Sequence, residues 1–590
     1  MSQEQFQDTL EAKRHSLAHI LAAAVAELYP GVKFAIGPNI ENGCYYDFDF
    51  GGHKVGEEDL PKIEQKMRQL IKKNLTFQFS VLPASQALEQ EKQRGQVYKA
   101  ELVADLIKDG HQEVSYYQVG DFKDLCSGPH IQHTSKLQKM GFKLHRLAGA
   151  YWRGDEKNKM LTRIYVLAFE SVEELNQYLE LLKKAEESDH RRLAKELELF
   201  MISDEVGKGL PLWLPNGAFI RKKLEDYMYK KERQAGYHFV YTPVLTREEL
   251  YQRSGHLAHY REDMYNPIDI EGENYYLKPM NCPHHHIMYK NTPKSYRDLP
   301  LRYADFGLIH RFERSGTLTG LIRARCFTQN DAHIYCRRQQ VKDELLGVLR
   351  LFKEVYTDFK IKGYWFRLSL PDFSNQEKYG DIKNREMWEE SAQIAREAMQ
   401  EFGAPYAEAE GEAAFYGPKI DVQIKNVFGK EDTIATVQVD FYMPERFDLK
   451  FINEKGEEER PVIIHRAIMG SFDRFFSFLV EQCGGAFPIW LSPLQAVLIS
   501  VGESHKEFCR QLAKKLDQAG VRVRVDDSDE TVGNKTRKAI KSKVPYIVVI
   551  GDKEKESGQL AVRRRGSREV ELMDFDSFVA EVKKKEKEKE

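Results

Sequence analysis

The sequence lacks the features that define several common protein classes. Its 590 residues include only seven cysteines, and none of them form a CxxC pair. No stretch approaches the roughly 20 apolar residues that a membrane helix requires. The N-terminal segment MSQEQFQDTLEAKRH has no apolar core of the kind found in secretory signals. These absences argue against a disulfide scaffold and favour a reducing compartment, so we expect a cytoplasmic protein.

The chain also lacks a strong net charge. Its formal charge is −2 at pH 7, with 42% hydrophobic and 31% charged residues, as is typical of a soluble globular protein. Because there is no overall basic field, any surface that binds nucleic acid must be a local patch. At about 100–200 residues per domain, the length predicts roughly three to five domains.

The order of local patterns predicts several different folding units. A helical pattern over residues 6–29 stops at Pro30-Gly31, and the aromatic segments CYYDFDF and TFQFSVL after it favour strands. Residues 171–200 predict one long amphipathic helix that serves as a connector. From residue 495 onward, strand and helix patterns alternate as in a βαβ-type domain, and the final KKKEKEKE is typical of a solvated tail.

The segment LKPMNCPHHHIM, residues 277–288, raises the question of a metal site. In an extended segment adjacent side chains point to opposite faces, so the consecutive histidines His284–His286 could not surround one ion. Any metal here would need ligands from distant segments. The histidines in RCFTQNDAHIYC and VIIHRAIMG are candidates, but spacing alone does not separate them from ordinary buried polar residues.

Four sequence segments that occur in a fixed order indicate the ligands of a metal site, because together they resemble a known family. PMNCP, HRFERSG, RARCFTQNDAH and HRAIMGSFDRF together closely resemble the bacterial-type threonyl-tRNA synthetases, a family of class II aminoacyl-tRNA synthetases. The resemblance extends from about residue 8 to residue 580 and implies a multidomain α+β and α/β protein. The family's small N-terminal ubiquitin-like domain is expected to be absent. The implied parts are an α+β editing domain (1–170), a linker helix (171–200), a class II catalytic domain with an antiparallel sheet (201–490), an α/β anticodon-binding domain (491–583) and a charged tail (584–590).

The resemblance implies a homodimeric ligase that activates L-threonine with ATP and transfers it to tRNA(Thr). It also implies one Zn²⁺ per chain, held by Cys282, His333 and His465, with His284–His286 as neighbours. One thiolate and two imidazoles suit a zinc site that keeps an open position, which would accept threonine's amine and hydroxyl. Mg²⁺ is expected with ATP because the phosphates need charge neutralisation.

Five residues are expected to bind ATP by this resemblance. Arginine suits a phosphate because its planar guanidinium bonds two oxygens and stays charged. Arg311 and Arg474 are the expected catalytic residues. The implied positions are Arg311 at the α-phosphate, Glu313 at the adenine amino group, Phe327 stacked on the base, Arg323 at the outer phosphates and Arg474 at the γ-phosphate.

Asp331, Tyr416 and Gln438 match family positions near the amine and hydroxyl of threonine. Two nearby residues depart from the family pattern: Thr433 stands where glutamine is frequent, and Cys326 where glycine is common. Pro243 in FVYTPVL matches the proline that ends the first class II motif, which lies at the dimer interface in this family.

The block GSFDRFFSFL predicts a helix with one buried face. Four of its apolar residues follow the spacing i, i+3, i+4, i+7: Phe472, Phe475, Phe476 and Leu479. Gly470, Ser471 and Arg474 are expected on another face of that helix, where the small residues would leave room for ATP.

A second chemistry is expected near the N-terminus. HSLAH places His15 and His19 one helical turn apart, and DLCSGPH holds Cys126 and His130. HxxxH with CxxxH also has the residue types and spacing of a zinc site, so a second metal remains an alternative. The resemblance favours a hydrolytic editing site in which these four residues and Asp124 act on Ser-tRNA(Thr). Serine lacks only one methyl of threonine, and such a difference allows only about 10–200-fold discrimination by binding.

The C-terminal region is expected to bind the anticodon. KTRKAIKSK and VRRRG form a local basic patch that could meet phosphates. Glu554 and Arg563 match positions that read anticodon bases, whereas Asp529 and Lys543 depart from the asparagine and arginine that are frequent there.

Two other functions compete with the interpretation of this chain as a ligase. A catalytically retired paralogue that binds RNA as a regulator would not need the intact ATP and zinc residues, and a metallohydrolase built on HxxxH would leave the three synthetase motifs unexplained.

Overall fold

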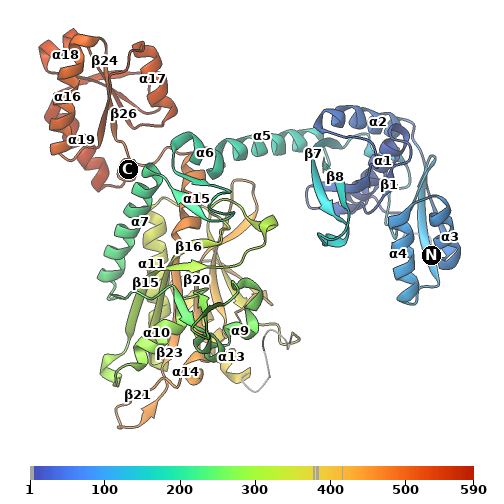
Figure 1. The fold of residues 1–590 in the computed structure, drawn as a ribbon, viewed down its shortest axis with the longest axis horizontal. Helices are drawn as coiled ribbons and strands as arrows, with labels where there is room; N and C mark the ends of the chain where they lie inside the picture. The colour runs from blue at the N-terminus through green and yellow to red at the C-terminus, as the bar shows by residue number, and fades with distance from the viewer. Residues whose placement is uncertain (1–5, 376–378, 380–384, 415) are drawn as a thin grey trace. The chain divides into compact units, whose positions relative to one another are not determined.

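The structure is a computed structural model that describes residues 6–375, 379, 385–414 and 416–590. It divides into two compact units, Met1–Leu182 and Lys183–Glu590, which Figure 1 shows in blue to cyan and in green to red. Across the described ranges, no helix is both long and apolar enough to cross a membrane.

The N-terminal unit is α+β, as predicted. Its central helix α1 (Leu10–Leu28) begins after Thr9, whose hydroxyl accepts the Ala12 N–H, and ends just before Pro30. The helix packs against a sheet of β1 (Lys33–Phe34), β2 (Asn39–Ile40), β3 (Gly43–Asp49), β7 (Gly141–Tyr151) and β8 (Met160–Phe169). A second sheet and three helices complete the unit: β4 (Phe77–Pro83), β5 (Glu113–Val119), β6 (Phe122–Leu125), α2 (Leu60–Lys72), α3 (Ala84–Gln93) and α4 (Val97–Lys108).

Two helices form the connector, so the prediction of one continuous helix over residues 171–200 is wrong. The helix α5 (Val172–Ser188) stops before Asp189, and α6 (His190–Leu197) starts after it. Asp189 has a non-helical backbone (φ −55°, ψ 123°), and its carboxylate accepts the Arg191 N–H at 2.7 Å. An aspartate in this N-cap position starts a new helix rather than continuing the old one.

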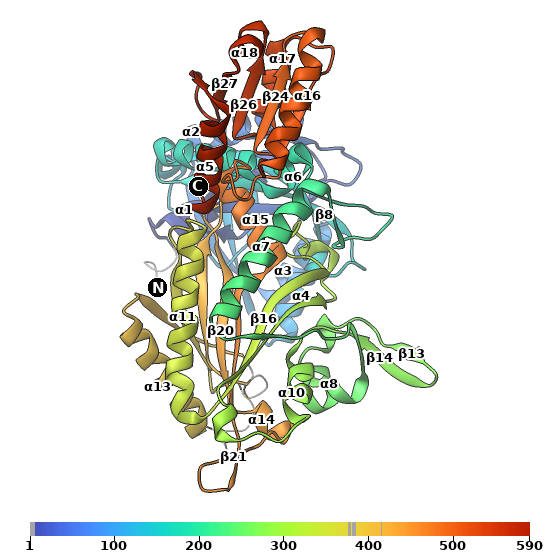
Figure 2. The same cartoon turned by 90° about the vertical axis from the view of Figure 1, so that its left-hand side faces the viewer.

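An eight-stranded sheet forms the centre of the second unit (Figure 2). Its strand order is β11-β15-β16-β23-β20-β19-β17-β18, and all neighbouring pairs are antiparallel except β11 with β15 and β17 with β18. The strands are β11 (His238–Phe239), β15 (Leu301–His310), β16 (Cys326–Cys336), β17 (Trp365–Leu370), β18 (Tyr406–Glu410), β19 (Lys419–Lys425), β20 (Glu431–Asp440) and β23 (Val462–Ser471).

Besides α6, four helices share their apolar core with this sheet in the described residues. Figure 2 shows two of them, α7 and α11, running alongside the strands. The helices are α7 (Pro215–Gln234), α11 (Val341–Asp358), α13 (Arg385–Phe402) and α15 (Phe472–Cys483). The predicted stripe of α15 is buried, because Phe472, Phe475, Phe476 and Leu479 all face this core.

Shorter elements surround the central sheet. Cys282 begins the helix α10 (Cys282–Lys290), so the HHH run is helical and the prediction that it is extended is wrong. Pro283 occupies the first turn, where the missing N–H of proline costs nothing. The other elements here are β9 (Phe200–Ile202), β10 (Pro211–Trp213), β12 (Leu245–Arg247), α8 (Glu248–Ser254), α9 (His256–His259), β13 (Ile268–Ile270), β14 (Glu273–Leu277), α14 (Met443–Arg446), β21 (Phe451–Ile452) and β22 (Glu458–Glu459).

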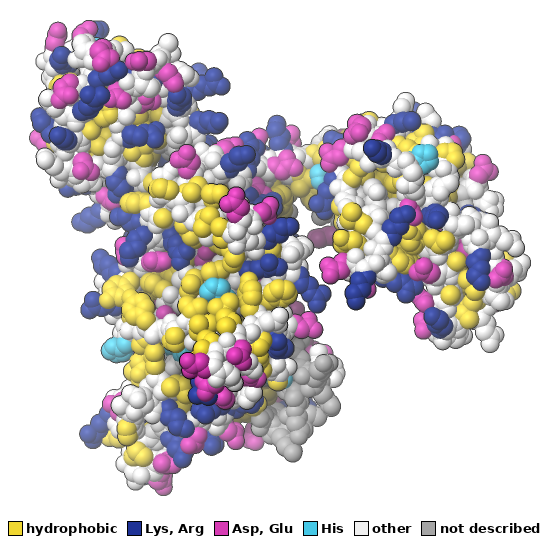
Figure 3. All heavy atoms as spheres, in the orientation of Figure 1, with side chains coloured by type: hydrophobic (Ala, Val, Ile, Leu, Met, Phe, Trp, Pro, Cys, Tyr) yellow, Lys and Arg dark blue, Asp and Glu magenta, His cyan; other side chains and the backbone are white. Residues whose placement is uncertain are grey.

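The C-terminal segment has the predicted alternation of strands and helices. Its sheet order is β25-β24-β26-β27-β28, with parallel pairing among the first three strands. Lys and Arg side chains gather along the edge that carries α17, as Figure 3 shows. The charged end of the chain continues α19 as far as Lys587. The elements are β24 (Ala496–Ser500), α16 (Glu503–Gln518), β25 (Val523–Asp526), α17 (Val532–Lys541), β26 (Tyr546–Ile550), α18 (Asp552–Ser557), β27 (Leu560–Arg564), β28 (Val570–Met573) and α19 (Phe575–Lys587).

Candidate active site and a second histidine-rich pocket

One cavity of about 970 Å³ in the second unit collects most of the residues predicted for ATP, threonine and metal. Their segments are far apart in the sequence, and the central sheet brings them together. Thr433, one of the two departures from the family pattern, also lines the cavity. The predicted residues that line it are Cys282, Arg311, Glu313, Arg323, Phe327, Asp331, Tyr416, Gln438, His465 and Arg474.

Sheet register explains how the metal candidates meet. His333 on β16 lies directly opposite His465 on β23, and His465 lies opposite Gln438 on β20. Directly opposed residues share one face of a sheet, so these three side chains form a row across it. Cys282 reaches the same point from the first turn of α10. Its Sγ and one nitrogen of each histidine all lie within 4.8 Å of one another.

The hydrogen bonds of the two histidines leave one nitrogen of each ring facing this point. His465 Nε2 lies 2.8 Å from Asp440 Oδ2, and His333 Nδ1 lies 2.7 Å from His285 Nδ1. The remaining atoms, His465 Nδ1 and His333 Nε2, are buried without a hydrogen-bond partner among the described residues. Buried polar atoms are rarely left unpaired.

A zinc ion is compatible with this donor set, and it would give each of the two orphaned nitrogens a partner. Burial lowers the pKa of His333 well below its usual value, so the ring is neutral and able to donate a lone pair. Burial raises the pKa of the Cys282 thiol well above its usual value in the absence of a metal. A coordinated metal would reverse that effect, because a coordinating thiol is deprotonated. One thiolate and two imidazoles leave an open position on zinc.

The residues predicted near threonine lie beside the metal candidates. Tyr416 donates a hydrogen bond to the Gln438 side-chain oxygen, and the Tyr416 ring lies 5.1 Å from the His465 ring between centroids. Asp331 is buried and accepts a hydrogen bond of 3.1 Å from Asn281 Nδ2. Asn281, which sequence reasoning missed, therefore orients a carboxylate that lines the cavity.

The three arginines predicted to bind ATP, Arg311, Arg323 and Arg474, also line the cavity. Arg323 Nε donates to Glu313 Oε2 at 2.7 Å, so the predicted phosphate and adenine contacts pair with each other here. The Arg311 guanidinium lies 5.4 Å from the centroid of the Phe327 ring. Arg474 donates to the backbone carbonyl oxygens of Ile322 at 3.0 Å and Thr433 at 3.1 Å. The cavity can therefore receive a polyanion.

The start of α15 differs from the prediction. Gly470 and Ser471 lie at the end of β23, not on a helical face shared with Arg474. Ser471 is the N-cap of α15, and its hydroxyl accepts the Arg474 N–H at 3.1 Å. Gly470 has φ +59°, and an added Cβ would lie 2.3 Å from the Ile434 carbonyl oxygen. Only glycine allows β20 to approach this closely, which brings Thr433 to Arg474.

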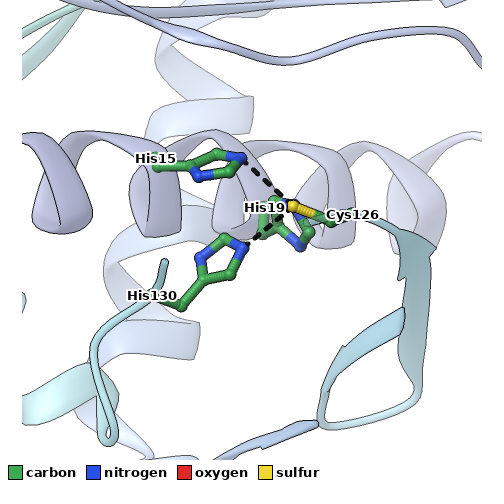
Figure 4. A group of neighbouring side chains, drawn as sticks. All are labelled: His15, His19, Cys126 and His130. Carbon is green, nitrogen blue, oxygen red and sulfur yellow. Dashed lines mark hydrogen bonds between the residues drawn. The ribbon is translucent and has the colours of Figure 1, made fainter. Parts of the chain in front are cut away.

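A second cavity, of about 730 Å³, lies in the N-terminal unit. His15 and His19 come from α1, and Cys126 and His130 come from the loop after β6 (Figure 4). The Cys126 sulfur lies 3.3 Å from Nε2 of His15 and 3.3 Å from Nε2 of His130. Ligand atoms of all four residues lie within 4.8 Å of one another, so the structure brings the two predicted motifs together.

This histidine cluster is uncharged near neutral pH. Burial lowers the pKa of His15 and lowers that of His19 and His130 well below the usual histidine value. Burial also raises the pKa of the Cys126 thiol to about 12. Neutral imidazoles and a thiol can orient water and hydroxyl groups by hydrogen bonds. The same donor set also fits a tetrahedral metal, so the geometry leaves the second-metal alternative open.

Asp124 in this pocket is held by two residues that sequence reasoning missed. Lys99 Nζ lies 2.7 Å from Asp124 Oδ1, and the Tyr46 hydroxyl donates to Asp124 Oδ2 at 2.5 Å. The side chains of Lys99 and Asp124 are each only 5% exposed. A lysine buried this deeply is rare unless it is paired. Nothing in the amphipathic pattern of α4 distinguishes it from a surface lysine.

The residues predicted to read the anticodon make local contacts in the C-terminal segment. Glu554 accepts the Gly551 N–H at 2.9 Å, and Arg563 Nε donates to the Ser567 carbonyl oxygen at 2.8 Å. Asp529, one of the two departures, pairs with Lys506 at 3.2 Å. Lys543, the other, has a left-handed backbone at φ +57°. These contacts fix loop and helix ends and assign no base contact by themselves.

Three family models match parts of this chain. The second additional domain of threonyl and alanyl tRNA synthetases matches residues 114–165. The class II core domain of the G, H, P, S and T synthetases matches residues 265–483, and an anticodon binding domain matches residues 495–585.

Whole-chain relatives and a solved structure agree with these matches. The threonine–tRNA ligase of Listeria welshimeri is 49% identical over 576 residues, which cover 98% of this chain and 89% of that protein. The threonine–tRNA ligase of Geobacillus kaustophilus is 49% identical over 574 residues, covering 97% and 87%. The crystal structure of the RNA binding domain of threonyl-tRNA synthetase from Cryptosporidium parvum aligns with a TM-score of 0.63 at 35% identity, covering 67% of this chain and 98% of that one.

Proposed function

We infer that this chain, which belongs to the threonine–tRNA ligase family, activates threonine with ATP and transfers it to tRNA(Thr). The class II core and the anticodon-binding domain agree with that activity. The observation that carries the assignment is one cavity that is lined by Arg311, Arg323 and Arg474 and by two members, Cys282 and His465, of the Cys-His-His group. Threonine-dependent ATP–pyrophosphate exchange on the purified protein tests it. A retired paralogue would show no exchange.

We propose that Arg311, Arg323 and Arg474 hold the triphosphate in line with the threonine carboxylate. A carboxylate oxygen attacks the α-phosphorus, the bond from that phosphorus to the bridging oxygen breaks, and pyrophosphate leaves with Mg²⁺. Arg311 stabilises the negative charge that develops on the α-phosphate, because its guanidinium is fixed in place before reaction. A ribose hydroxyl of the tRNA then attacks the activated carbonyl carbon, and AMP leaves.

The roles proposed for the remaining cavity residues follow from their positions. Glu313, released from Arg323, accepts a hydrogen bond from the adenine amino group, and Phe327 stacks on the base. Asp331, Tyr416 and Gln438 surround the amine and hydroxyl of threonine. Cys282, His333 and His465 would hold one Zn²⁺, which supplies coordination positions for that amine and hydroxyl. Valine lacks the hydroxyl, and a site built around a polar group rejects such analogues by about 10⁴–10⁵.

The second additional domain supports hydrolysis of mischarged Ser-tRNA(Thr) in the N-terminal unit. We propose that His15, His19, Cys126 and His130 position water and the terminal ribose at the seryl ester. Lys99 and Asp124 form a buried ion pair that holds both charged side chains in place at the wall of this pocket. In the C-terminal segment we propose that Glu554 and Arg563 contact anticodon bases. ATP and tRNA(Thr) are both found in the cytoplasm, where we propose that the protein acts.

We propose a homodimer that forms through the β11 edge of the catalytic sheet. Tyr241 beside this strand is 84% exposed, and Tyr229 and Leu308 nearby are 42% and 38% exposed. An exposed apolar face along a sheet edge is typical of a protein interface. Pro243, the predicted interface proline, follows two residues after Tyr241. Sedimentation of Tyr241→Asp tests the proposal, with Ile268→Asp on the β13 hairpin as a control, because Ile268 is also exposed, at 44%. Only the first variant should shift toward monomer.

A further inference from the structure

One tight turn carries part of the proposed ATP site. The turn from Thr319 to Arg323 is closed by the hydrogen bonds Ile322 N to Thr319 O at 3.0 Å and Thr319 N to Arg323 O at 3.1 Å. Its Ile322 carbonyl oxygen accepts a hydrogen bond from Arg474, and its last residue is Arg323 itself. Any displacement of this turn therefore moves Arg323 and breaks the hydrogen bond that the turn accepts from Arg474.

A buried histidine from the connector holds this turn from behind. His190, the first residue of α6, is 1% exposed, and its Nε2 accepts the backbone N–H of Leu321 at 3.3 Å. An imidazole nitrogen that accepts an N–H carries no proton. The proton therefore sits on Nδ1, which donates to Glu481 Oε1 at 2.7 Å. Glu481 lies on α15, the same helix that carries Arg474.

The approach of the turn to His190 depends on glycine. Gly320 adopts φ +51°, and a Cβ added there would lie 2.2 Å from His190 Nε2. No side chain larger than hydrogen fits between the turn and the imidazole. Sequence reasoning did not single out His190, because a lone histidine in a charged connector looks like a solvated residue.

We propose that His190 is a positioning residue for ATP. It links α15 to the turn, so that the two elements carrying Arg474 and Arg323 keep a fixed relation to each other. The inference rests on the proposed ligase function and adds a residue outside all three synthetase motifs. The residues proposed to bind threonine and zinc lie on β16, β20, β23 and α10 and at Tyr416, and none of them contacts His190 in the described structure. Loss of its contact should therefore weaken ATP binding and leave threonine binding unchanged.

Two amide substitutions separate the two hydrogen bonds of His190. Asparagine places its amide near Nδ1, so His190→Asn keeps a donor for Glu481 and loses the acceptor for Leu321. Glutamine reaches the position of Nε2, so His190→Gln restores that acceptor. Leaving the buried N–H of Leu321 without a hydrogen-bond partner should raise KM for ATP on the order of tenfold. We expect KM for ATP to rise about tenfold in the first variant and less in the second, which keeps the contact to the turn but loses the donor to Glu481.

His505 provides a matched control, because it is also buried and its Nδ1 accepts the Gly502 N–H at 3.1 Å. It lies on α16, in the segment matched by the anticodon-binding model. His505→Asn should leave both KM values in ATP–pyrophosphate exchange unchanged. Gly320→Ala is a second route to the same effect, since it pushes the turn away while His190 stays intact, and it too should raise KM for ATP.

The exchange assay separates failure of this proposal from failure of the ligase assignment. Wild-type protein without threonine-dependent exchange would overturn the assignment itself. Active wild type with an unchanged KM for ATP in His190→Asn would overturn the positioning role. Equal rises in the KM values for ATP and threonine would do the same, because they would indicate general damage to the fold. If His190→Asn does not fold, an unchanged KM for ATP in Gly320→Ala decides against the proposal.

Discussion

Asp440 Oδ2 lies 2.8 Å from Nε2 of His465 and thereby determines which nitrogen of that ring can face the cavity. A carboxylate can only accept, so Nε2 carries the proton and Nδ1 keeps its lone pair. The other Asp440 oxygen accepts the backbone N–H groups of Tyr442 at 2.8 Å and Met443 at 2.9 Å. Asp440 is thus locked at both oxygens, and the ring is presented as a metal ligand before any metal binds.

Asp440→Asn should weaken zinc binding. The backbone donors of α14 would keep the amide oxygen on their side, so the amide NH₂ would face His465. The ring would then accept a hydrogen bond at Nε2 and carry its proton on Nδ1. That proton would occupy the lone pair that Nδ1 must donate to the metal. Loss of such a supporting residue typically reduces metal affinity about 10–100-fold. Competition between protein and a chelator measures the affinity directly.

Asp473→Asn is the control for that experiment, because Asp473 is also buried in this unit and accepts the Thr328 N–H at 2.8 Å. It should retain wild-type zinc affinity. Metal analysis of the wild type should find one zinc per chain in the catalytic unit. Equal affinities in Asp440→Asn and wild type would contradict the role of Asp440.

Arg311→Ala should nearly abolish adenylate formation. The substitution removes a fixed positive charge from the position where the α-phosphate gains negative charge, and the loss of one such group costs on the order of 10²–10³ in rate. Threonine-dependent exchange is the measurement. Arg314→Ala, three residues away, is the control, because the Arg314 side chain is 82% exposed. Unchanged exchange in Arg311→Ala would rule out the proposed role.

The fold class and the family could be predicted from the sequence because long ordered blocks carry them. The partners that orient the functional groups could not. Lys99 and Asp124 pair across 25 residues, and Asp440 reaches His465 only because β20 and β23 are neighbours in the sheet. Burial of a charged group is a property of the assembled fold. The break at Asp189 was missed for a similar reason, since amphipathic spacing continues across a residue whose carboxylate caps the next helix.

Stability should fall as the pH drops below about 6.5, in part because of His256. This residue is 1% exposed, and burial lowers its pKa to about 3. Between pH 6.5 and about pH 3, His256 is protonated in the unfolded chain and neutral in the folded chain. The contribution of His256 is therefore fully present above pH 6.5 and declines by about 1.4 kcal/mol per pH unit as the pH falls.

Thermal midpoints at several pH values measure this effect. The acid-induced loss between pH 7.5 and pH 5 should be smaller in His256→Asn than in wild type, because the variant lacks one buried histidine that must stay neutral. The exposed His53 supplies the control, and His53→Asn should follow the wild-type curve. A wild-type midpoint that rises on acidification would contradict the sign of the prediction.

His19→Ala and Cys126→Ala should allow Ser-tRNA(Thr) to accumulate while threonine activation stays normal. The two residues lie in the histidine cluster of the N-terminal unit, whereas the described residues that line the 970 Å³ cavity all belong to the second unit. Loss of a group that positions or transfers protons at the ester should slow deacylation by about 10²-fold or more. Hydrolysis of preformed Ser-tRNA(Thr) measures this, with the exposed His53→Ala as control. Equal rates in mutants and wild type would remove the editing assignment. A wild-type rate lost on chelation and restored by zinc would instead favour a metal held by His15, His19, Cys126 and His130.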